Sequence, residues 1–247
     1  MSSTDFLLAL ENVSVSFDGF KAVNELNLYI DKGELRAIIG PNGAGKTTVL
    51  DLIGGRTRVS EGSIKFKDQE ITGCKEQEIV RRGIGRKFQT PTIYEDLTVF
   101  ENLELSLPRG RNVAGALFWK RTKDVIGRVR EVARVIFLDE HLDRMAETLS
   151  HGQKQWLEIG MLLMQDPELL MLDEPVAGMS VSERVRTAEL LERVSKGRAV
   201  IVIDHDMKFV ESIAHRVTVL HQGKVLAEGS MTTIQDNPQV KEVYLGH

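Results

Sequence analysis

Residues 40 to 47, "GPNGAGKT", combine three glycines with a lysine and a threonine at a spacing that suits the binding of phosphate groups. The segment fits G-x-x-x-x-G-K-S/T and lies between the apolar run "LRAII" and the helical pattern "TTVLDLI", the context that a phosphate-binding loop requires. Glycines let backbone N–H groups turn toward an anion at a helix start. Lys46 supplies a full charge for the β and γ phosphates of a nucleotide, and Thr47 supplies a hydroxyl for Mg²⁺. The residues expected to contact the nucleotide here are Gly40, Pro41, Asn42, Gly43, Ala44, Gly45, Lys46, Thr47 and Thr48.

Two further sets of polar residues follow apolar runs. Asp173 and Glu174 come directly after "LLML", and His205 lies just beyond "AVIVI". Because ligands bind at the carboxyl ends of parallel strands, we predict that Asp173 holds the Mg²⁺ shell and that Glu174 polarises an attacking water. A histidine at a strand end is often structural or simply exposed, so the residues alone leave the role of His205 open.

Composition limits the classes of protein that fit. The chain has 247 residues, enough to bury a full core. A net charge of -4 and a pI near 5.9 argue against a protein coated in nucleic acid. The single cysteine, Cys74, excludes an internal disulfide and suits a reducing compartment. We find neither a secretory signal pattern nor an apolar run long enough to span a membrane, so we expect a cytosolic protein whose membrane role would need partners.

Hydrophobic patterns predict the strands that position these residues. Val13, Val15 and Phe17 alternate with polar residues, and "LNLYI" repeats the alternation, which predicts an antiparallel β start. The runs "LRAIIG", "LLML" and "AVIVI" are continuously apolar, as expected of strands buried on both faces. Helical patterns follow each of them, so the centre of the sheet should be parallel.

The rest of the chain predicts helices and one hairpin. Residues about 98 to 165 are mostly helical in pattern and strongly charged, which indicates a helical subdomain inserted into the core. The segment "RVTVLHQGKVLAEG" predicts a hairpin that turns at Gln222 and Gly223. Val240, Val243 and Tyr244 fit an amphipathic helix that caps the domain. The predicted fold class is α/β, one domain over residues 1–247 with a parallel-sheet core, an antiparallel β subdomain and the helical insertion.

The order of these motifs, with Gln89 in "KFQTP" and "LSHGQ" at residues 149–153, resembles the ATP-binding cassette (ABC) ATPase family over essentially the whole chain. The resemblance implies a P-loop ATPase that uses ATP and Mg²⁺. It also implies that Ser150, Gly152 and Gln153 meet the γ-phosphate of ATP on an opposite subunit, so that two cassettes pair head to tail. A helix start with a small hydroxyl suits that task, because its N–H groups and dipole favour anions.

Three more roles follow from the resemblance. Gln89 resembles the glutamine that senses Mg²⁺ and the water and couples the site to membrane subunits; a polar side chain without that role is the alternative. His205 resembles the switch histidine that contacts the γ-phosphate. Phe17 resembles the aromatic that stacks on adenine, although it shares a face with Val13 and Val15 and could equally belong to the core.

Two positions depart from the family's usual pattern. His151 stands where the most frequent signature has glycine, and Ser180 stands where the loop after the catalytic glutamate often ends in aspartate. Neither change removes a group needed for phosphate, metal or water. The segments "KFQTPTIYEDLTVFENL", "PVAGMS", "DHDM" and "VKEVYLG" resemble the branch that energises uptake of branched-chain amino acids and related amides. Residues 149–179 look closest to urea importers, so the resemblance implies an importer ATPase for urea or short amides, with branched-chain amino acids as the alternative.

The implied partners are a second ABC ATPase subunit of the same or a homologous chain, transmembrane permease subunits and, indirectly, a solute-binding protein, with no nucleic acid. The implied place is the cytoplasmic face of the inner membrane. The basic stretches 81–87 and 108–123 are most simply solvated faces. The second also contains Leu117, Phe118 and Trp119, and could instead lie near the membrane subunit or anionic headgroups.

Three other classes of protein share part of the pattern. An ABC ATPase acting on nucleic acid or ribosomes should show long coiled-coil heptads or two cassettes in one chain, and neither is present. A GTPase would normally need an Asn-Lys-x-Asp element, which we do not find. A binding module without catalysis would not need both Lys46 and Glu174.

Overall fold

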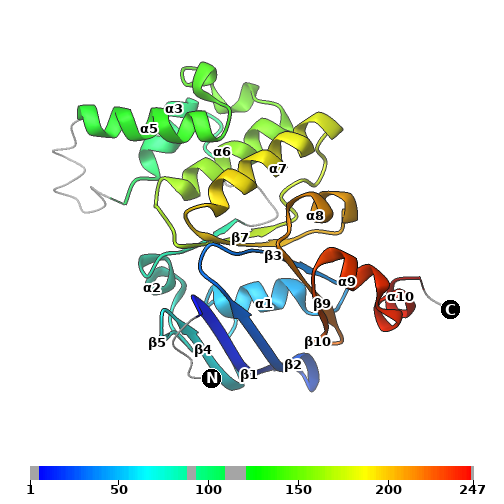
Figure 1. The fold of residues 1–247 in the computed structure, drawn as a ribbon. Helices are drawn as coiled ribbons and strands as arrows, with labels where there is room; N and C mark the ends of the chain where they lie inside the picture. Colours follow the sequence, from blue (N-terminus) through cyan, green and yellow to red (C-terminus); the bar gives the residue numbers. More distant parts are fainter. Residues whose placement is uncertain (1–5, 88–92, 109–120, 246–247) are drawn as a thin grey trace.

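The computed structural model describes residues 6–87, 93–108 and 121–245, and its strands form two sheets (Figure 1). A four-stranded antiparallel sheet has the order β2-β1-β4-β5. Its strands are β1 (Leu8–Phe17), β2 (Phe20–Ile30), β4 (Glu61–Phe66) and β5 (Gln69–Glu70). A six-stranded sheet has the order β10-β9-β3-β8-β7-β6. Its strands are β3 (Leu35–Ile39), β6 (Ile84–Lys87), β7 (Leu169–Asp173), β8 (Ala199–Ile203), β9 (Arg216–His221) and β10 (Lys224–Gly229).

The larger sheet is parallel except at one edge. Strands β9, β3, β8, β7 and β6 pair in parallel, and only β10 runs antiparallel to its neighbour. The hairpin prediction is confirmed, because β9 and β10 are joined by Gln222 and Gly223 with φ angles of 49° and 76°. Two successive residues in the left-handed region form the two-residue turn that matches strand twist.

The continuous apolar runs are confirmed as strands with covered faces on both sides. Every residue of β3, β7 and β8 is buried. Along β7, Leu169 and Met171 join the core cluster beneath the sheet, whereas Leu170 and Leu172 join the cluster above it. This alternation explains why such strands contain no polar face.

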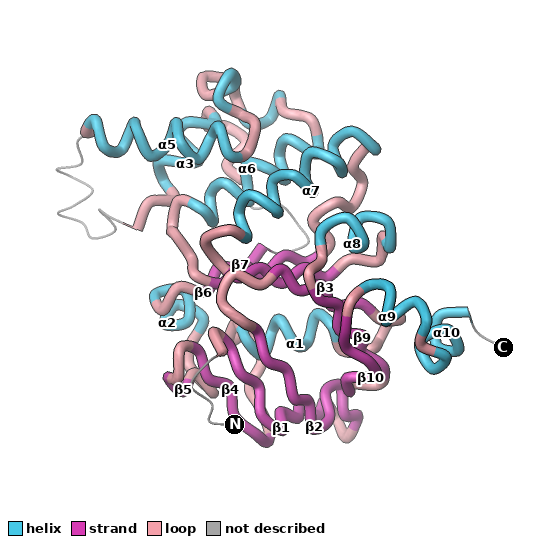
Figure 2. Tube along the Cα trace, viewed as in Figure 1, coloured by secondary structure: helices cyan, strands magenta, loops and turns pink. Residues whose placement is uncertain are grey.

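Helices fill the layers on the two sides of the parallel sheet. The described helices are α1 (Lys46–Ile53), α2 (Glu76–Arg81), α3 (Val99–Leu105), α5 (Lys123–Val135), α6 (His151–Leu163), α7 (Val181–Ser195), α8 (Met207–Ile213), α9 (Met231–Asp236) and α10 (Pro238–Leu245). Helix α1 lies between the two sheets, and α3, α5, α6 and α7 lie on the opposite side of the six-stranded sheet (Figure 2). Short 3-10 turns occupy Asp139–His141 and Ala146–Thr148.

The interval about 98 to 165 contains α3, α5, α6 and both 3-10 turns among its described residues. Leu103 and Val132, from α3 and α5, pack with Leu157 of α6 in the upper cluster. At the other end of the chain Val240 of α10 is buried against Met231 and Ile234 of α9.

Candidate active site

The phosphate loop connects β3 to α1, and its glycines are required by close backbone packing. A Cβ atom at Gly40 would collide with the carbonyl oxygen of Leu220, and one at Gly45 would lie 2.5 Å from the carbonyl oxygen of Ala22. Gly45 also caps α1 with a φ of 98°, in the left-handed region. These positions hold the loop against β9 and β2, so its backbone geometry is set before any ligand binds.

Lys46 lies across its own loop. Its Nζ donates hydrogen bonds to the carbonyl oxygens of Gly40 at 2.8 Å and Pro41 at 3.0 Å. Burial lowers the pKa of Lys46, and the nearby carboxylates of Asp173 and Glu174 act in the opposite direction. The ammonium therefore lies in a partly desolvated position between the loop and the two acids, where an anion is strongly attracted.

Thr47 and Asp173 meet at the end of β7. The Thr47 hydroxyl donates to Oδ2 of Asp173 at 3.1 Å. The Asp173 side chain is only 2 % exposed, its Oδ1 has no hydrogen-bond partner among the described residues, and burial raises its pKa. A buried carboxylate oxygen without a partner, beside a hydroxyl, is a donor set that fits a hard cation such as Mg²⁺.

Glu174 and His205 are brought together because β7 and β8 are neighbours in the sheet. Nδ1 of His205 lies 3.5 Å from Oε1 of Glu174, and the His205 side chain is 74 % exposed. The backbone N–H of Glu174 donates to the carbonyl oxygen of Ile203 at 2.8 Å, and Glu174 has a φ of 47°. A non-glycine residue in the left-handed region is uncommon and marks a sharp turn directly after the strand.

Asp204 is an acid of this strand end that the sequence reasoning missed. It is 2 % exposed, its Oδ1 accepts the N–H of Asp206 at 2.9 Å, and its Oδ2 has no partner among the described residues. Burial raises the pKa of Asp204, partly offset by its hydrogen bond and by His205. The signal was available, because Asp204 follows "AVIVI" as directly as Asp173 follows "LLML".

Phe17 is not a core residue, so that alternative is wrong. Its side chain is 48 % exposed and lines a cavity of about 350 Å³ together with residues 42–48, Asp173 and Glu174. Phe20 lines the same cavity, is 66 % exposed and pairs directly with Phe17 across the β1–β2 hairpin. The sequence reasoning missed Phe20, although "FDGF" contains the Asp-Gly pair that favours a two-residue hairpin turn and sets the flanking residues opposite each other.

The segment "LSHGQ" lies elsewhere, at the start of α6. Ser150 is the N-cap and accepts the N–H of Gln153, whose side chain in turn accepts the N–H of Ser150 at 3.0 Å. The Ser150 hydroxyl donates to Oε1 of Glu183 on α7 at 3.0 Å. Neither these residues nor Gly152 are among the described residues that line the cavity at the phosphate loop. The predicted catalytic and metal-sensing residue Gln89 lies outside the described residues.

The basic stretches are only partly solvated. Arg86 pairs with Asp51 at 2.8 Å, and Lys87 is buried and lies 3.4 Å from Glu158. A solvated face is therefore wrong for these two residues, since β6 carries them into the protein. In the second stretch Arg121 pairs with Glu104 at 2.7 Å, and residues 109–120, including Leu117, Phe118 and Trp119, lie outside the described part of the chain.

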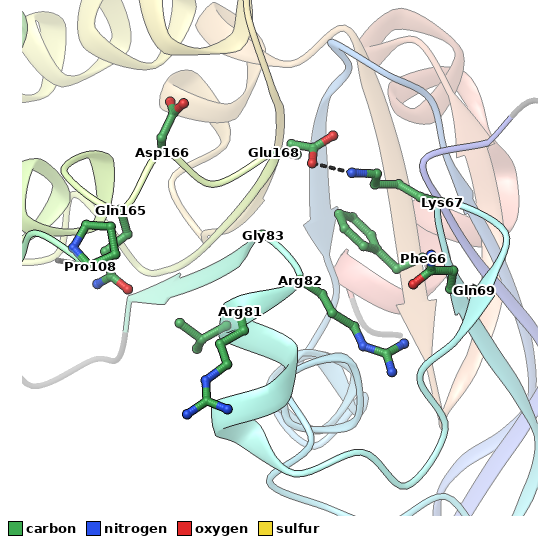
Figure 3. A pocket seen from close by; sticks show the side chains of 11 residues that line it. Phe66, Lys67, Gln69, Arg81, Arg82, Gly83, Pro108, Gln165, Asp166 and Glu168 are labelled. Carbon is green, nitrogen blue, oxygen red and sulfur yellow. Dashed lines mark hydrogen bonds and ion pairs between the residues drawn. The ribbon is translucent and has the colours of Figure 1, made fainter. Parts of the chain in front are cut away.

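A larger cavity, of about 590 Å³, lies beside Gly83, and charged residues that line it pair with neighbouring side chains and do not converge on one space (Figure 3). Lys67 pairs with Glu168 at 2.5 Å, whereas Arg82 pairs with Glu78 at 2.6 Å. Figure 3 shows Arg81 and Arg82 extending away from the acids on the opposite wall. The smaller cavity is the stronger candidate because its loop, lysine and two acids converge on one space.

Comparison with known proteins identifies the family. The sequence profile described as ABC transporter matches residues 23–177, more than half of the chain. The chain belongs to this family. A second profile, described as branched-chain amino acid ATP-binding cassette transporter, matches residues 224–247.

The sequence similarity to known relatives extends over nearly the full length of both chains. The probable branched-chain amino acid transport ATP-binding protein LivG of Archaeoglobus fulgidus is 35 % identical, covering 97 % of this chain and 95 % of that protein. The high-affinity branched-chain amino acid transport ATP-binding protein LivG of Escherichia coli K12 is also 35 % identical, covering 97 % and 98 %. Among solved structures, an ABC transporter cassette in its ADP conformation matches with a TM-score of 0.86 at 31 % identity, covering 98 % of this chain and 99 % of that one.

The family assignment establishes an ATP-binding ABC cassette of the ATPase class, and the fold class predicted from the sequence is confirmed. A dimeric cassette in a post-hydrolysis state bound to ADP and Pi matches with a TM-score of 0.75 at 25 % identity, covering 91 % of this chain and 98 % of that chain. ABC ATPase subunits act as dimers beside transmembrane permease partners. In the described part of this chain, no helix is long and apolar enough to cross a membrane.

Proposed function

We propose that this chain is the ATP-hydrolysing subunit of an importer for branched-chain amino acids. The observation that carries the solute class is the match of residues 224–247 to the branched-chain amino acid cassette profile, in agreement with the names of the LivG relatives. The chain would act at the cytoplasmic face of the inner membrane, beside permease subunits that a solute-binding protein supplies. Nucleic acid is not among its proposed partners.

The phosphate loop binds the nucleotide in this proposal. Lys46 and the backbone N–H groups of residues 40–48 hold the β and γ phosphates, and Lys46 exchanges its two carbonyl partners for phosphate oxygens. Phe17 and Phe20 line the same cavity and would stack on the base. The aromatic pair thus fixes one end of ATP while the loop fixes the other.

Hydrolysis depends on the ends of β7 and β8. Thr47 and Asp173 would hold Mg²⁺, which would neutralise charge on the phosphates. Glu174 orients and polarises the attacking water, and His205, 3.5 Å from Glu174, contacts the γ-phosphate. The transition state of phosphoryl transfer is loose, so positioning and charge stabilisation carry most of the catalysis.

A second cassette completes the site. Ser150, Gly152 and Gln153 of one chain meet the γ-phosphate bound by the other, which the exposed position of the Ser150 cap supports. The second chain is either a copy of this one or a homologue. Gln89 senses the metal and water and passes closure to the permease.

Urea remains the second candidate, because residues 149–179 resemble urea importers. Uptake of labelled leucine and labelled urea should be measured in cells that lack this chain, with the wild type or Glu174→Gln restored separately. We expect leucine uptake to be lost and rescued by the wild type only. Loss of urea uptake alone would transfer the assignment to urea, and unchanged uptake of both solutes would refute the proposed function.

A further inference from the structure

Helix α6 places three polar side chains on one face, at i, i+4 and i+7. They are His151, Gln155 and Glu158, which we name the polar face of α6. Gln155 and Glu158 are 2 % and 4 % exposed, and their neighbours Trp156, Leu157 and Ile159 belong to the core. Buried polar groups lower stability unless they have specific partners, so the partners of this face indicate what it does.

At the start of the helix the partner is the turn that follows Glu174. Nε2 of His151 lies 3.0 Å from the carbonyl oxygen of Ala177. A carbonyl oxygen only accepts hydrogen bonds, so the bond to Ala177 requires the tautomer of His151 in which Nε2 is protonated and donates the hydrogen bond. The imidazole also lies against Gly178, where an added Cβ atom would be 3.2 Å from Nε2.

The same turn is tied to Glu174 by one hydrogen bond. The N–H of Ala177 donates to the carbonyl oxygen of Glu174 at 3.2 Å. A single residue, Ala177, therefore joins the histidine to the turn in which Glu174 adopts a φ of 47°. Glycine at position 151 would leave the Ala177 carbonyl without this donor, which gives His151 a physical task that the sequence alone did not reveal.

The far end of the polar face is held by a buried charge pair. Glu158 lies 3.4 Å from Nζ of Lys87, the last residue of β6, and both side chains are almost fully buried. A buried pair of this kind resists separation, because each charge would otherwise remain desolvated and unpaired. Helix α6 is thus fixed to β6 near its middle and to the turn after Glu174 at its start.

The start of α7 adds a second connection. Glu183 accepts the Ser150 hydroxyl at 3.0 Å and the N–H of Ser180 at 2.9 Å. The segment from Glu174 to Ser180 is therefore attached to the start of α6 twice, through His151 at Ala177 and through Glu183 at Ser180.

We propose that His151 is a positioning residue for ATP hydrolysis, which holds the turn carrying Glu174 to the N-terminus of α6. The inference rests on the proposed roles of Glu174 and Ser150. Since Ser150 caps the same helix, a γ-phosphate that engages Ser150 from the partner chain shifts the helix end to which this chain's own Glu174 turn is bound. The contact makes hydrolysis in one site sensitive to occupancy of the other.

The test measures ATP hydrolysis by the purified full chain as a function of ATP concentration. We expect His151→Ala to lower kcat about tenfold through misplacement of Glu174, with the ATP concentration for half-maximal rate within about twofold of wild type and a reduced Hill coefficient. His151→Gln, which keeps an N–H donor, should restore part of kcat. His141→Ala, in the 3-10 turn Asp139–His141, is the matched control and should leave all three quantities unchanged.

A double-mutant cycle separates this role from a general loss of folding. Gly178 has a φ of 72°, so Gly178→Ala strains the backbone in both backgrounds, and it presses on the imidazole only where His151 is present. It should therefore lower kcat more in the wild type than in the His151→Ala background. An equal cost in both backgrounds, or an unchanged kcat in His151→Ala, would overturn the inference. Wild-type protein that lacks hydrolysis, or hydrolysis unaffected by Glu174→Gln, would instead refute the proposed function.

Discussion

The two regions proposed to contact ATP find their partners in different ways. Around the phosphate loop, Thr47, Asp173 and Glu174 line one cavity at the ends of buried strands, and their contacts lie within the chain. At the start of α6, Ser150 is exposed and its hydroxyl reaches Glu183 on the next helix. The first region is assembled by the fold itself, whereas the second offers its groups at a surface. Variants in the first region should therefore impair ATP hydrolysis at the site of their own chain. Variants in the second region should impair hydrolysis at the site of the partner chain.

The largest effect is expected from Glu174→Gln. Removal of the water-polarising carboxylate should lower kcat about 1000-fold, while ATP binding persists and holds a closed dimer. Phosphate release and gel filtration in ATP measure the two properties. Glu189→Gln, an exposed glutamate on α7, is the control and should behave as wild type. Hydrolysis at the normal rate in Glu174→Gln would contradict the base assignment.

Ser150→Ala should lower kcat about 100-fold, as loss of one donor to a transition-state oxyanion does. A mixture of the Ser150→Ala and Glu174→Gln proteins tests whether the two regions act on the same ATP from different chains. In a head-to-tail pair of two copies, a mixed dimer concentrates both defects in one site and leaves the other intact, so two nearly inactive proteins should regain activity. Failure of the mixture to exceed the sum of its parts would argue that Ser150 serves its own chain.

Phe17→Ala and Phe20→Ala should each raise the ATP concentration for half-maximal rate by about tenfold, since a stacked aromatic contributes about 1–3 kcal/mol per base. Steady-state hydrolysis measures the change, and kcat at saturating ATP should stay near the wild-type value. Phe17→Tyr keeps the ring and serves as the control. An unchanged requirement for ATP in both alanine variants would show that the base binds elsewhere.

The smallest effect is expected from Glu183→Gln. The pKa of Glu183 is lowered mainly by hydrogen bonds from Ser180, so the carboxylate is charged at neutral pH beside the start of α6. Glutamine preserves the capping box and removes the charge. Loss of this negative charge should lower the ATP concentration needed for dimerisation about twofold to fivefold, the size of effect expected for one charge at a helix end. This prediction assumes that the Glu183 carboxylate, which accepts the Ser150 hydroxyl, competes with the γ-phosphate of the partner's ATP for the start of α6. Light scattering during an ATP titration measures the requirement, and a higher ATP requirement in Glu183→Gln would contradict that assumption.

The sequence predicts the first region well because its information is local. The phosphate loop, its lysine and the acids after β7 are each contained in a short motif between elements of clear period. Strand order is not local, so the 3.5 Å approach of His205 to Glu174 becomes visible only when β7 and β8 pair. Asp204 shows that a recognisable signal can still be overlooked.

The second region depends on contacts between distant positions. Ser150 and Glu183 are 33 positions apart, and no periodicity relates them. Lys87 reads as part of a basic, solvated stretch, yet β6 carries it to Glu158 in the interior. His151 reads as a departure from a common motif, and its partner is a backbone carbonyl, which no residue type reveals.

The left-handed backbone conformation of Glu174 lowers the stability of the protein, whereas its side chain is needed for ATP hydrolysis in the proposed mechanism. A non-glycine residue in this conformation costs about 1 kcal/mol, so Glu174→Gly should make the protein more resistant to heat while removing its water-activating group. Directed evolution for thermal tolerance alone would discard this glutamate early. A screen for hardier transporters of this family should therefore select on solute uptake at every round.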